Sequence, residues 1–191
     1  MRSTIPLILP FLAIGLPAVE VAVIAAKLES STAGAQAKAW VAAHGLPLMS
    51  DPAIVAAVAA QNAKQATLDA IKAIDAEWMK AEQPLPIMAE LQSNAAALAL
   101  AAVVKAHPAL TEVFVMDNQG ANVAMVAPTS DYWQGDEDKW RNSYAAGAGG
   151  VDVGKARLDK STNKVQQQIS LPILAADGAV IGAITFGLGF H

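Results

Sequence analysis

The sequence predicts an α+β fold in which long N-terminal helices back a five-stranded antiparallel sheet. Three observations indicate this fold. Apolar residues recur every three or four positions in the segment 52–106, as on one face of a helix. After Pro108 the pattern changes to short runs typical of strands, and Gly-containing turns at 118–120 and 176–178 separate some of these runs. With 191 residues and 54% hydrophobic content, the chain is long enough for one domain with a helical extension.

The N-terminus has the layout of a secretory signal peptide. Arg2 precedes an apolar run from Ile5 to Ala26, with small residues around Gly15 to Ala18. We expect cleavage near residue 18 and an exported, periplasmic protein. An uncleaved membrane anchor reaching to about residue 26 is the alternative, because the run has about the 20 residues that a bilayer requires. Glu20 and three Pro residues weaken the anchor hypothesis, since a carboxylate in hydrocarbon is costly.

The rest of the chain divides into a helical extension and one domain. The segment 19–50 is rich in Ala and weakly patterned, so we expect a helix and a linker there, with breaks at residues 30–32 and Gly34. The predicted domain covers residues 51–191. It opens with Asp51-Pro52, where Asp can cap a helix and Pro can occupy the first helical position.

Two helices are predicted at the start of this domain, from Asp51 to Gln83 and from Ile87 to Ala106. Their apolar faces contain three polar residues, Asn62, Asp75 and Asn94, where Leu or Ile would be expected. A buried amide or carboxylate must find hydrogen-bond partners or it destabilises the fold. Either these residues connect the helices to a neighbouring loop or strand, or they line a cavity.

Five runs after Pro108 are predicted as strands: 112–117, 122–127, 151–158, 164–174 and 179–190. Consecutive hairpins are the simplest connection for the last three. Between the second and third runs, Asp136 to Ala145 is expected to form a short helix, with Asp136 as its cap.

Composition excludes several classes of function. The net charge is -4 and the 13 basic residues are scattered, which argues against nucleic-acid binding. The absence of Cys removes disulfides and thiolate chemistry. The three histidines, His44, His107 and His191, lie far apart in sequence, and no catalytic or nucleotide-binding motif occurs. The acidic run at 136–138 lacks the spacing of a calcium loop. We therefore predict neither an enzyme nor a bound metal or cofactor.

The loop from Pro128 to Trp140, PTSDYWQGDEDKW, concentrates the chain's polar aromatic residues. It holds two of the four Trp residues, one of the two Tyr residues and four carboxylates. Hydrogen-bonding aromatics beside charges are what a small polar ligand needs. The same residues suit a surface loop in which Trp133 and Trp140 cover the core, so both interpretations stand.

Three stretches now resemble a known family. They are EVFVMDNQGANVAMVAPTSDYWQGDEDKW (112–140), VQQQISLPI (165–173) and DGAVIGAITFGL (177–188). They are similar to extracytoplasmic single Cache domains, also called PDC domains, which are PAS-like sensors in bacterial receptors and in free-standing exported proteins. The similarity extends over about residues 51–190. It implies a long helix behind a five-stranded sheet and a ligand pocket between the sheet and the loops after its second strand.

The resemblance also implies which residues form the pocket. The loop would be 131–144, and Asp159 with Gln166 or Gln168 would close the site opposite it. The implied loop residues are Asp131, Tyr132, Trp133, Asp138, Trp140, Arg141 and Tyr144. Because strand side chains alternate, Gln167 faces away from Gln166 and Gln168, but which face meets the pocket stays open.

Two ligand chemistries fit these residues. The guanidinium of Arg141 suits a carboxylate, which it can bind through two hydrogen bonds. The acidic and aromatic residues suit an amine. An amino acid or a related small polar metabolite satisfies both, so we expect that ligand class, with organic acids and amines as alternatives.

The resemblance implies signal transduction, and the chain ends at the last predicted strand with Phe190-His191. We therefore expect the signal to pass to a separate partner, such as a membrane receptor or another output protein, with a homodimer as a further option. The competing hypothesis is a helical scaffold or dimerising protein without a ligand, since Ala-rich helices pack closely.

Overall fold

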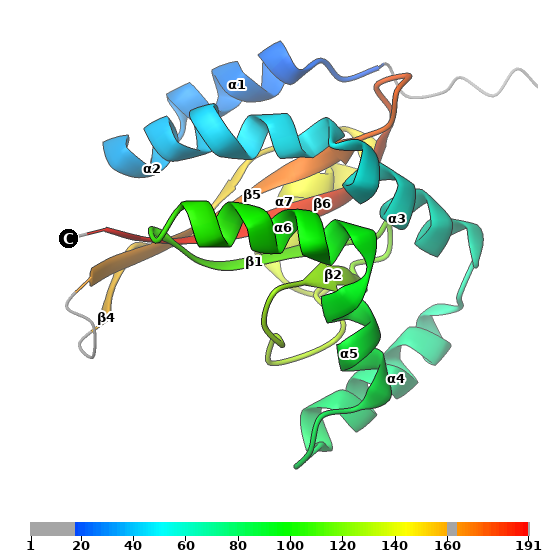
Figure 1. The fold of residues 1–191 in the computed structure, drawn as a ribbon. Coiled ribbons are helices and arrows are strands. Elements are labelled where there is room, and N and C mark those ends of the chain that lie inside the picture. Colours follow the sequence, from blue (N-terminus) through cyan, green and yellow to red (C-terminus); the bar gives the residue numbers. More distant parts are fainter. Residues whose placement is uncertain (1–17, 160–163, 191) are drawn as a thin grey trace, which may run out of the picture.

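The computed structural model describes residues 18–159 and 164–190, so the predicted signal peptide falls outside the described residues except for its last residue, and of the alternative anchor only residues 18–26 are described. Within them the chain is α+β, with helices on both sides of a six-stranded antiparallel sheet (Figure 1). The helices are α1 (Val21–Ser30), α2 (Ala35–Trp40), α3 (Pro52–Ala63), α4 (Leu68–Lys80), α5 (Pro86–Ser93), α6 (Ala95–Ala106) and α7 (Asp138–Tyr144). The strands are β1 (Leu110–Met116), β2 (Asn122–Met125), β3 (Asp152–Val153), β4 (Arg157–Asp159), β5 (Lys164–Leu174) and β6 (Val180–Phe190).

The strand order is β2-β1-β6-β5-β3, with β4 also paired to β5. When β3 and β4 are counted as one interrupted strand, five strands remain in the order 2-1-5-4-3, which is PAS-like. The predicted third strand, 151–158, is interrupted by a bulge. Asp152 and Val153 pair with Ser170 and Ile169, whereas Arg157 pairs with Gln166, so the segment between Val153 and Arg157 holds one extra residue.

One face of the sheet is covered by the N-terminal helices. Figure 1 shows α1, α2, α3 and α6 lying along this face. Alternate strand residues point into the main core there, among them Val115 of β1, Ile169 and Leu171 of β5, and Ile184 and Phe186 of β6. Burial of these side chains against the helices holds the two layers together.

The opposite face carries α7 and a second, smaller core. Helix α7 packs on β5 and β6, near the buried hydroxyls of Ser170 and Thr185, which are 2.8 Å apart. The second core joins α4, α5 and the polar loop to the sheet through Ile71, Trp78, Met88, Leu91, Phe114, Met116, Ala121, Met125, Tyr132 and Ala183. The helices thus cover most of one sheet face, whereas α7 and the second core cover only part of the other.

Each long predicted helix is divided in two. Gln65 adopts a left-handed conformation with φ 49°, and the Thr67 hydroxyl then caps α4 by accepting from the amide of Ala70 at 3.2 Å. Asn94 is extended and caps α6 by accepting from the amide of Ala97 at 2.9 Å. The predictions of unbroken helices were wrong because these polar side chains start new helices.

The helix breaks limit how far any one helix runs. Across residues 18–159 and 164–190, no single helix is both long enough and apolar enough for a membrane span. Two bent pairs reach that length and composition together, Ala35–Ser50 with Pro52–Ala63 and Pro86–Ser93 with Ala95–Ala106.

The three polar residues on the predicted helical faces connect the helices to neighbouring strands and loops, which was the first of the two interpretations. Asn62 donates to a backbone carbonyl of β6 at 2.8 Å, and Asn94 donates to a backbone carbonyl of β2 at 2.8 Å. Asp75 accepts from the backbone amides of Tyr132 and Trp133, both at 2.9 Å. The polar loop is thus fixed to α4 by a buried carboxylate.

Candidate functional site

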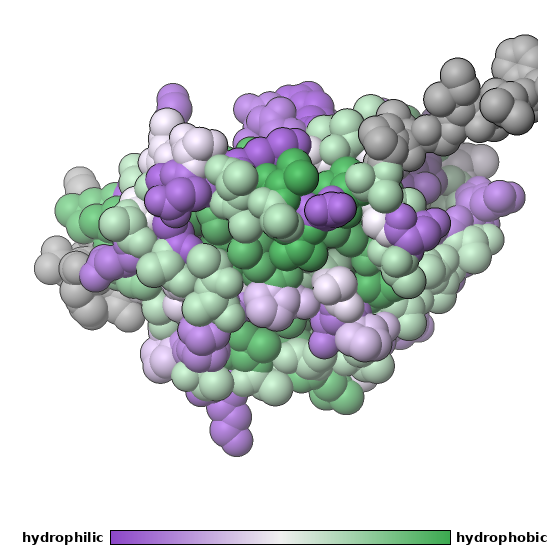
Figure 2. Space-filling view, turned by 90° about the horizontal axis from the view of Figure 1, so that it is seen from above, coloured by the Kyte–Doolittle hydropathy of each residue, from purple (hydrophilic) through white to green (hydrophobic). Residues whose placement is uncertain are grey.

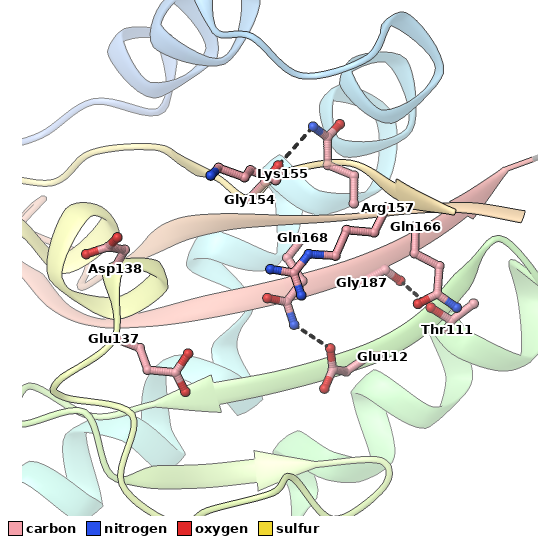
Figure 3. Close-up of a pocket in the computed structure, with 11 residues that line it drawn as sticks. Thr111, Glu112, Glu137, Asp138, Gly154, Lys155, Arg157, Gln166, Gln168 and Gly187 are labelled. Carbon is pink, nitrogen blue, oxygen red and sulfur yellow. Dashed lines mark hydrogen bonds between the residues drawn. The ribbon is translucent and has the colours of Figure 1, made fainter. Parts of the chain in front are cut away.

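An open, polar pocket of about 730 Å³ lies on the partly covered face of the sheet. It is bounded by the start of α7, the adjoining parts of β1, β5 and β6, and the bulged segment before β4 (Figure 3). The lining residues are Thr111, Glu112, Glu137, Asp138, Gly154, Lys155, Arg157, Gln166, Gln167, Gln168 and Gly187. A volume of this size falls within the range of small-molecule sites.

The pocket is hollow because a glycine forms part of its floor. The strand register places Gly187 of β6 between Glu112 of β1 and Gln168 of β5. A Cβ atom at position 187 would lie 2.8 Å from the Cβ of Glu112 and 3.1 Å from its Oε2. Across this gap the amide of Gln168 donates to Oε2 of Glu112 at 2.8 Å. A larger residue at position 187 would push the Glu112 side chain away from Gln168 and into the pocket.

Charges of both signs line the pocket. Glu112 accepts a hydrogen bond from the neutral Gln168 amide, and the carboxylate of Glu137 forms an ion pair with Lys139 at 3.0 Å. Within the part of the chain that the structure describes, Lys155 and Arg157 have no ion-pair or hydrogen-bond partner for their side chains. Figure 3 shows the side chains of Arg157, Gln168 and Glu112 extending into the same space from three strands.

Three of the sequence-predicted residues line this pocket: Asp138, Gln166 and Gln168. The Gln167 side chain serves a different purpose. It donates to the carbonyl of Gly154 at 3.0 Å and accepts from the amide of Gly34 at 3.0 Å. The strand alternation thus directs Gln166 and Gln168 to the face that carries the pocket.

Three other predicted residues belong to the loop itself. Asp131 accepts hydrogen bonds from Ser130 and from the amide of Gln134. Tyr132 is 3% exposed in the second core, and its hydroxyl accepts from Gln61 at 3.2 Å. The indole of Trp133 donates to the carbonyl of Gln119 at 2.8 Å and packs against the same core. None of the three is among the residues that line the pocket.

The remaining predicted residues lie on α7 and β4. Trp140 stacks on Tyr144 with ring centroids 5.1 Å apart and donates to the carbonyl of Asp117 at 2.9 Å. Arg141 forms an exposed ion pair with Asp138 at 2.8 Å. Asp159 is the last residue of β4, and its side chain lies outside the described residues.

The prediction that Asp136 caps this helix was wrong. The residue at the N-cap position of α7 is Glu137, and its side chain accepts no capping hydrogen bond. The side chain of Glu137 is instead paired with Lys139 at the pocket. A cap position occupied by an acid therefore does not by itself establish a capping hydrogen bond.

A buried acid lies beneath the polar loop, beside the chain's two tyrosines. Asp117 is 3% exposed and accepts from the amides of Gln119 at 2.8 Å and Ala121 at 2.9 Å. Burial raises the pKa of Asp117, and these hydrogen bonds oppose that rise. Burial also raises the pKa of Tyr132 and of Tyr144, and the negative charge of Asp117 raises both further.

Sequence reasoning missed eight of the eleven lining residues, and four of these decide the charge and shape of the pocket: Glu112, Lys155, Arg157 and Gly187. The alternation of β1 places Glu112 on the same face as Phe114. Glycines at alternate positions of the last strand leave one face of that strand without side chains. Those two signals were available in the sequence. Lys155 and Arg157 carried no such signal, because the bulge that directs them cannot be located by periodicity.

The described part of the chain brings no three His, Asp or Glu side chains together in a way that suits a metal ion. Its pocket instead presents hydrogen-bonding amides and single charges. These groups are suited to binding a small polar molecule.

Comparisons with known proteins give similarities at the level of solved structures. The ligand-binding domain of the Pseudomonas aeruginosa amino acid chemoreceptor PctC, solved with GABA, is 15% identical with a TM-score of 0.37, over 73% of this chain and 58% of that chain. The sensor domain of the Vibrio cholerae histidine kinase DctB is 14% identical with a TM-score of 0.38, over 88% and 55%. The ligand-binding domain of the Campylobacter jejuni chemoreceptor Tlp3, solved with 4-methylisoleucine, is 16% identical with a TM-score of 0.38, over 83% and 62%.

In each of these three cases the chain spans less than two thirds of the other domain. All three TM-scores lie below 0.5, and the ligands are those of the chemoreceptors themselves. No protein-family model and no curated protein matches the chain.

Proposed function

We propose that this chain is an exported sensor or binding protein of the single Cache type that holds an amino acid or a related small polar metabolite. The observation that carries the proposal is the glycine-floored pocket, with unpaired cationic side chains and carboxylates around one space. The PAS-like strand order and the sequence resemblance over residues 51–190 support the same class of protein.

The charges of the pocket suit a molecule that carries both an acid and an amine. The Arg157 guanidinium can bind a carboxylate through two parallel hydrogen bonds, and Lys155 adds a second positive charge on the same segment. Glu112 supplies a carboxylate for an ammonium group. The amides of Gln166 and Gln168 provide neutral donors and acceptors between them. An organic acid would use only the basic residues and an amine only the acidic ones.

As a sensor, the protein would transmit binding to a separate partner, such as a membrane receptor or another output protein. Residues 51–191 would form the sensing domain, and the predicted N-terminal signal segment would direct export. The loop residues Asp131, Tyr132 and Trp133 would then stabilise the loop instead of contacting the ligand. The Asp131 carbonyl accepts from Asn122 of β2, and the amides of Tyr132 and Trp133 donate to Asp75 of α4.

The first experiment is a thermal-shift screen of the purified protein against amino acids, organic acids, amines and divalent cations. A ligand at one hundred times its Kd stabilises the folded state by about 2.7 kcal/mol, which for a chain of this size raises Tm by roughly 5 to 10 °C. We expect one class of amino acid or close relative to produce such a shift. A screen without any shift contradicts the proposal and favours the scaffold hypothesis.

Pocket variants then locate the site. We expect Arg157→Gln and Glu112→Gln each to weaken binding of the identified compound at least about tenfold, because each removes a charged partner of the ligand. Lys105→Gln on α6 and Glu90→Gln on α5 are matched controls, since both side chains are exposed and neither lines the pocket. Gly187→Val fills the floor and should abolish binding. Binding that survives Gly187→Val would place the site elsewhere.

A further inference from the structure

We propose that residues 145–155 form a relay that couples occupancy of the pocket to the N-terminal helices α1 and α2. The ligand in this inference is the one of the proposed function, whereas the mechanical connection depends only on contacts within the chain. The segment leaves the C-terminal end of α7, passes through β3 and ends at Lys155. We refer to residues 145–155 as the relay segment.

Both ends of the unit formed by α7 and the relay segment reach the pocket. Glu137 and Asp138 line it at the start of α7, while Gly154 and Lys155 line it at the far end of the relay segment. A ligand that fills the pocket therefore touches the same stretch of chain twice. Binding would fix the position of the start of α7 relative to Lys155.

The relay segment is strained where it leaves α7. Ala145 and Ala146 have φ values of 49° and 51°, and Gly147 and Gly149 have φ values of 86° and 67°. The left-handed region is unfavourable for a residue with a Cβ atom, and here two successive alanines occupy it. Hydrogen bonds from the amides of Gly149 and Gly150 back to α7 hold this conformation. A segment held in this way is suited to changing conformation when α7 moves.

Two hydrogen-bonded connections join the relay segment to the N-terminal helices. The ammonium of Lys27 on α1 donates to the carbonyl of Gly149 at 2.7 Å. The amide of Gln167 donates to the carbonyl of Gly154 at 3.0 Å, and its oxygen accepts from the amide of Gly34, the N-cap residue of α2, at 3.0 Å. Gln167 therefore links the edge of the pocket to the start of α2.

These hydrogen bonds give the pocket a route to α1 and α2, in addition to the packing of Val151 and Val153 against the main core. When a ligand fixes α7 and Lys155 together, the carbonyls of Gly149 and Gly154 change position or lose freedom. Lys27 and Gln167 pass that change to the two helices. Because the coupling free energy between two sites is reciprocal, a partner that restricts the motion of α1 and α2 would equally raise the affinity of the pocket for its ligand.

A chemical clamp tests the relay without a ligand. The chain has no Cys, so Asp138→Cys with Lys155→Cys gives a unique thiol pair across the pocket. A short bis-maleimide bridges the pair, and the same variant capped with a monofunctional maleimide is the reference. Hydrogen exchange is measured for amides in residues 21–40. We expect bridging to change exchange there by about fivefold or more, as coupling of ordinary size requires.

Removing the connections completes the test. In Lys27→Met the effect of bridging should weaken over α1, and in Lys27→Met with Gln167→Leu the bridged and capped proteins should exchange alike over residues 21–40. Lys27 is exposed, so the single variant should fold normally. A bridge between Glu77→Cys and Lys80→Cys on α4 is the control and should leave α1 and α2 unchanged.

The relay is refuted if bridging leaves exchange over residues 21–40 unchanged, or if its effect persists after both connections are removed. An empty ligand screen together with a positive clamp result would overturn the proposed function and keep the relay. A confirmed ligand, together with no effect of bridging on exchange over residues 21–40, would keep the proposed function and overturn the relay.

Discussion

The carboxylate of Asp75 is predicted to be a principal stabiliser of the polar loop. It lies on α4 with 9% exposure, and Oδ1 accepts from the amides of Tyr132 and Trp133, both at 2.9 Å. The substitution Asp75→Ala would remove the acceptor and leave both amides unpaired. Tyr132 is buried, so water cannot easily replace the lost hydrogen bond.

The magnitude follows from these two bonds. Leaving a buried donor without a partner costs about 1–3 kcal/mol, so two donors give an expected loss of about 3–5 kcal/mol in the free energy of unfolding. Asp75→Asn keeps an oxygen acceptor and loses the charge, so we expect a smaller loss of about 1–2 kcal/mol. Glu77→Ala on the same helix is the control and should stay within about 0.5 kcal/mol, since Glu77 is exposed.

Urea denaturation followed by tryptophan fluorescence measures all three variants. Trp78 and Trp133 lie beside the substituted position and report on the loop. The midpoint should fall in the order Asp75→Ala, Asp75→Asn, Glu77→Ala, with the largest fall first and the slope m unchanged. If Asp75→Ala were as mild as Glu77→Ala, the hydrogen bonds of Asp75 would not hold the loop, and the reasoning would be wrong.

Three further predictions use other buried or partly buried polar groups. Asn94→Ala should lower the free energy of unfolding by about 2–3 kcal/mol in urea titrations, because it removes the cap of α6 and the hydrogen bond to β2. The pKa of Asp117 is raised in the folded state, so above pH 3.8 the native protein binds more protons than the unfolded chain. The free energy of unfolding should therefore fall as pH rises from 3.8 through the folded-state pKa of Asp117. In denaturation series at stepped pH, Asp117→Asn should remove this dependence of stability on pH. The pKa of Tyr132 and of Tyr144 is raised above 10.0, so the native state keeps protons that the unfolded chain loses, and stability should fall as pH rises above 10.0. These are the only two tyrosines, so ultraviolet titration of the phenolates should show both midpoints moving down in Asp117→Asn, and unchanged midpoints would contradict the influence of that charge.

Much of the fold was predictable from local patterns. The change from helical to alternating periodicity after Pro108 located the sheet, and Gly120, with φ 85°, marks the first hairpin turn where the sequence predicted it. The helix breaks were not predicted, since Thr67 and Asn94 look like ordinary helical residues until their side chains are seen to cap new helices. Short-range periodicity does not distinguish a polar residue inside a helix from one that starts the next helix.

The candidate site was predictable only in part. Alternation correctly placed Gln166 and Gln168 on one side of β5 and Gln167 on the other, and the motif resemblance drew attention to α7 and Asp138. The aromatic loop residues drew more attention than Glu112, since a cluster in sequence is easier to see than a cluster in space.

The sequence by itself determined the types of element, the positions of the turns and the two-residue alternation of each strand, because these depend on neighbours within a few positions. Only the tertiary structure decided which sheet face stays partly open, and which charges meet there. Glu112 and Arg157 are far apart in sequence and come together because β1, β6 and β5 pair side by side, with Gly187 leaving room between β1 and β5 for the side chains of Glu112 and Gln168 to meet. A one-residue bulge before Arg157 sets the register of that side chain, and its position follows from strand pairing that no local pattern encodes.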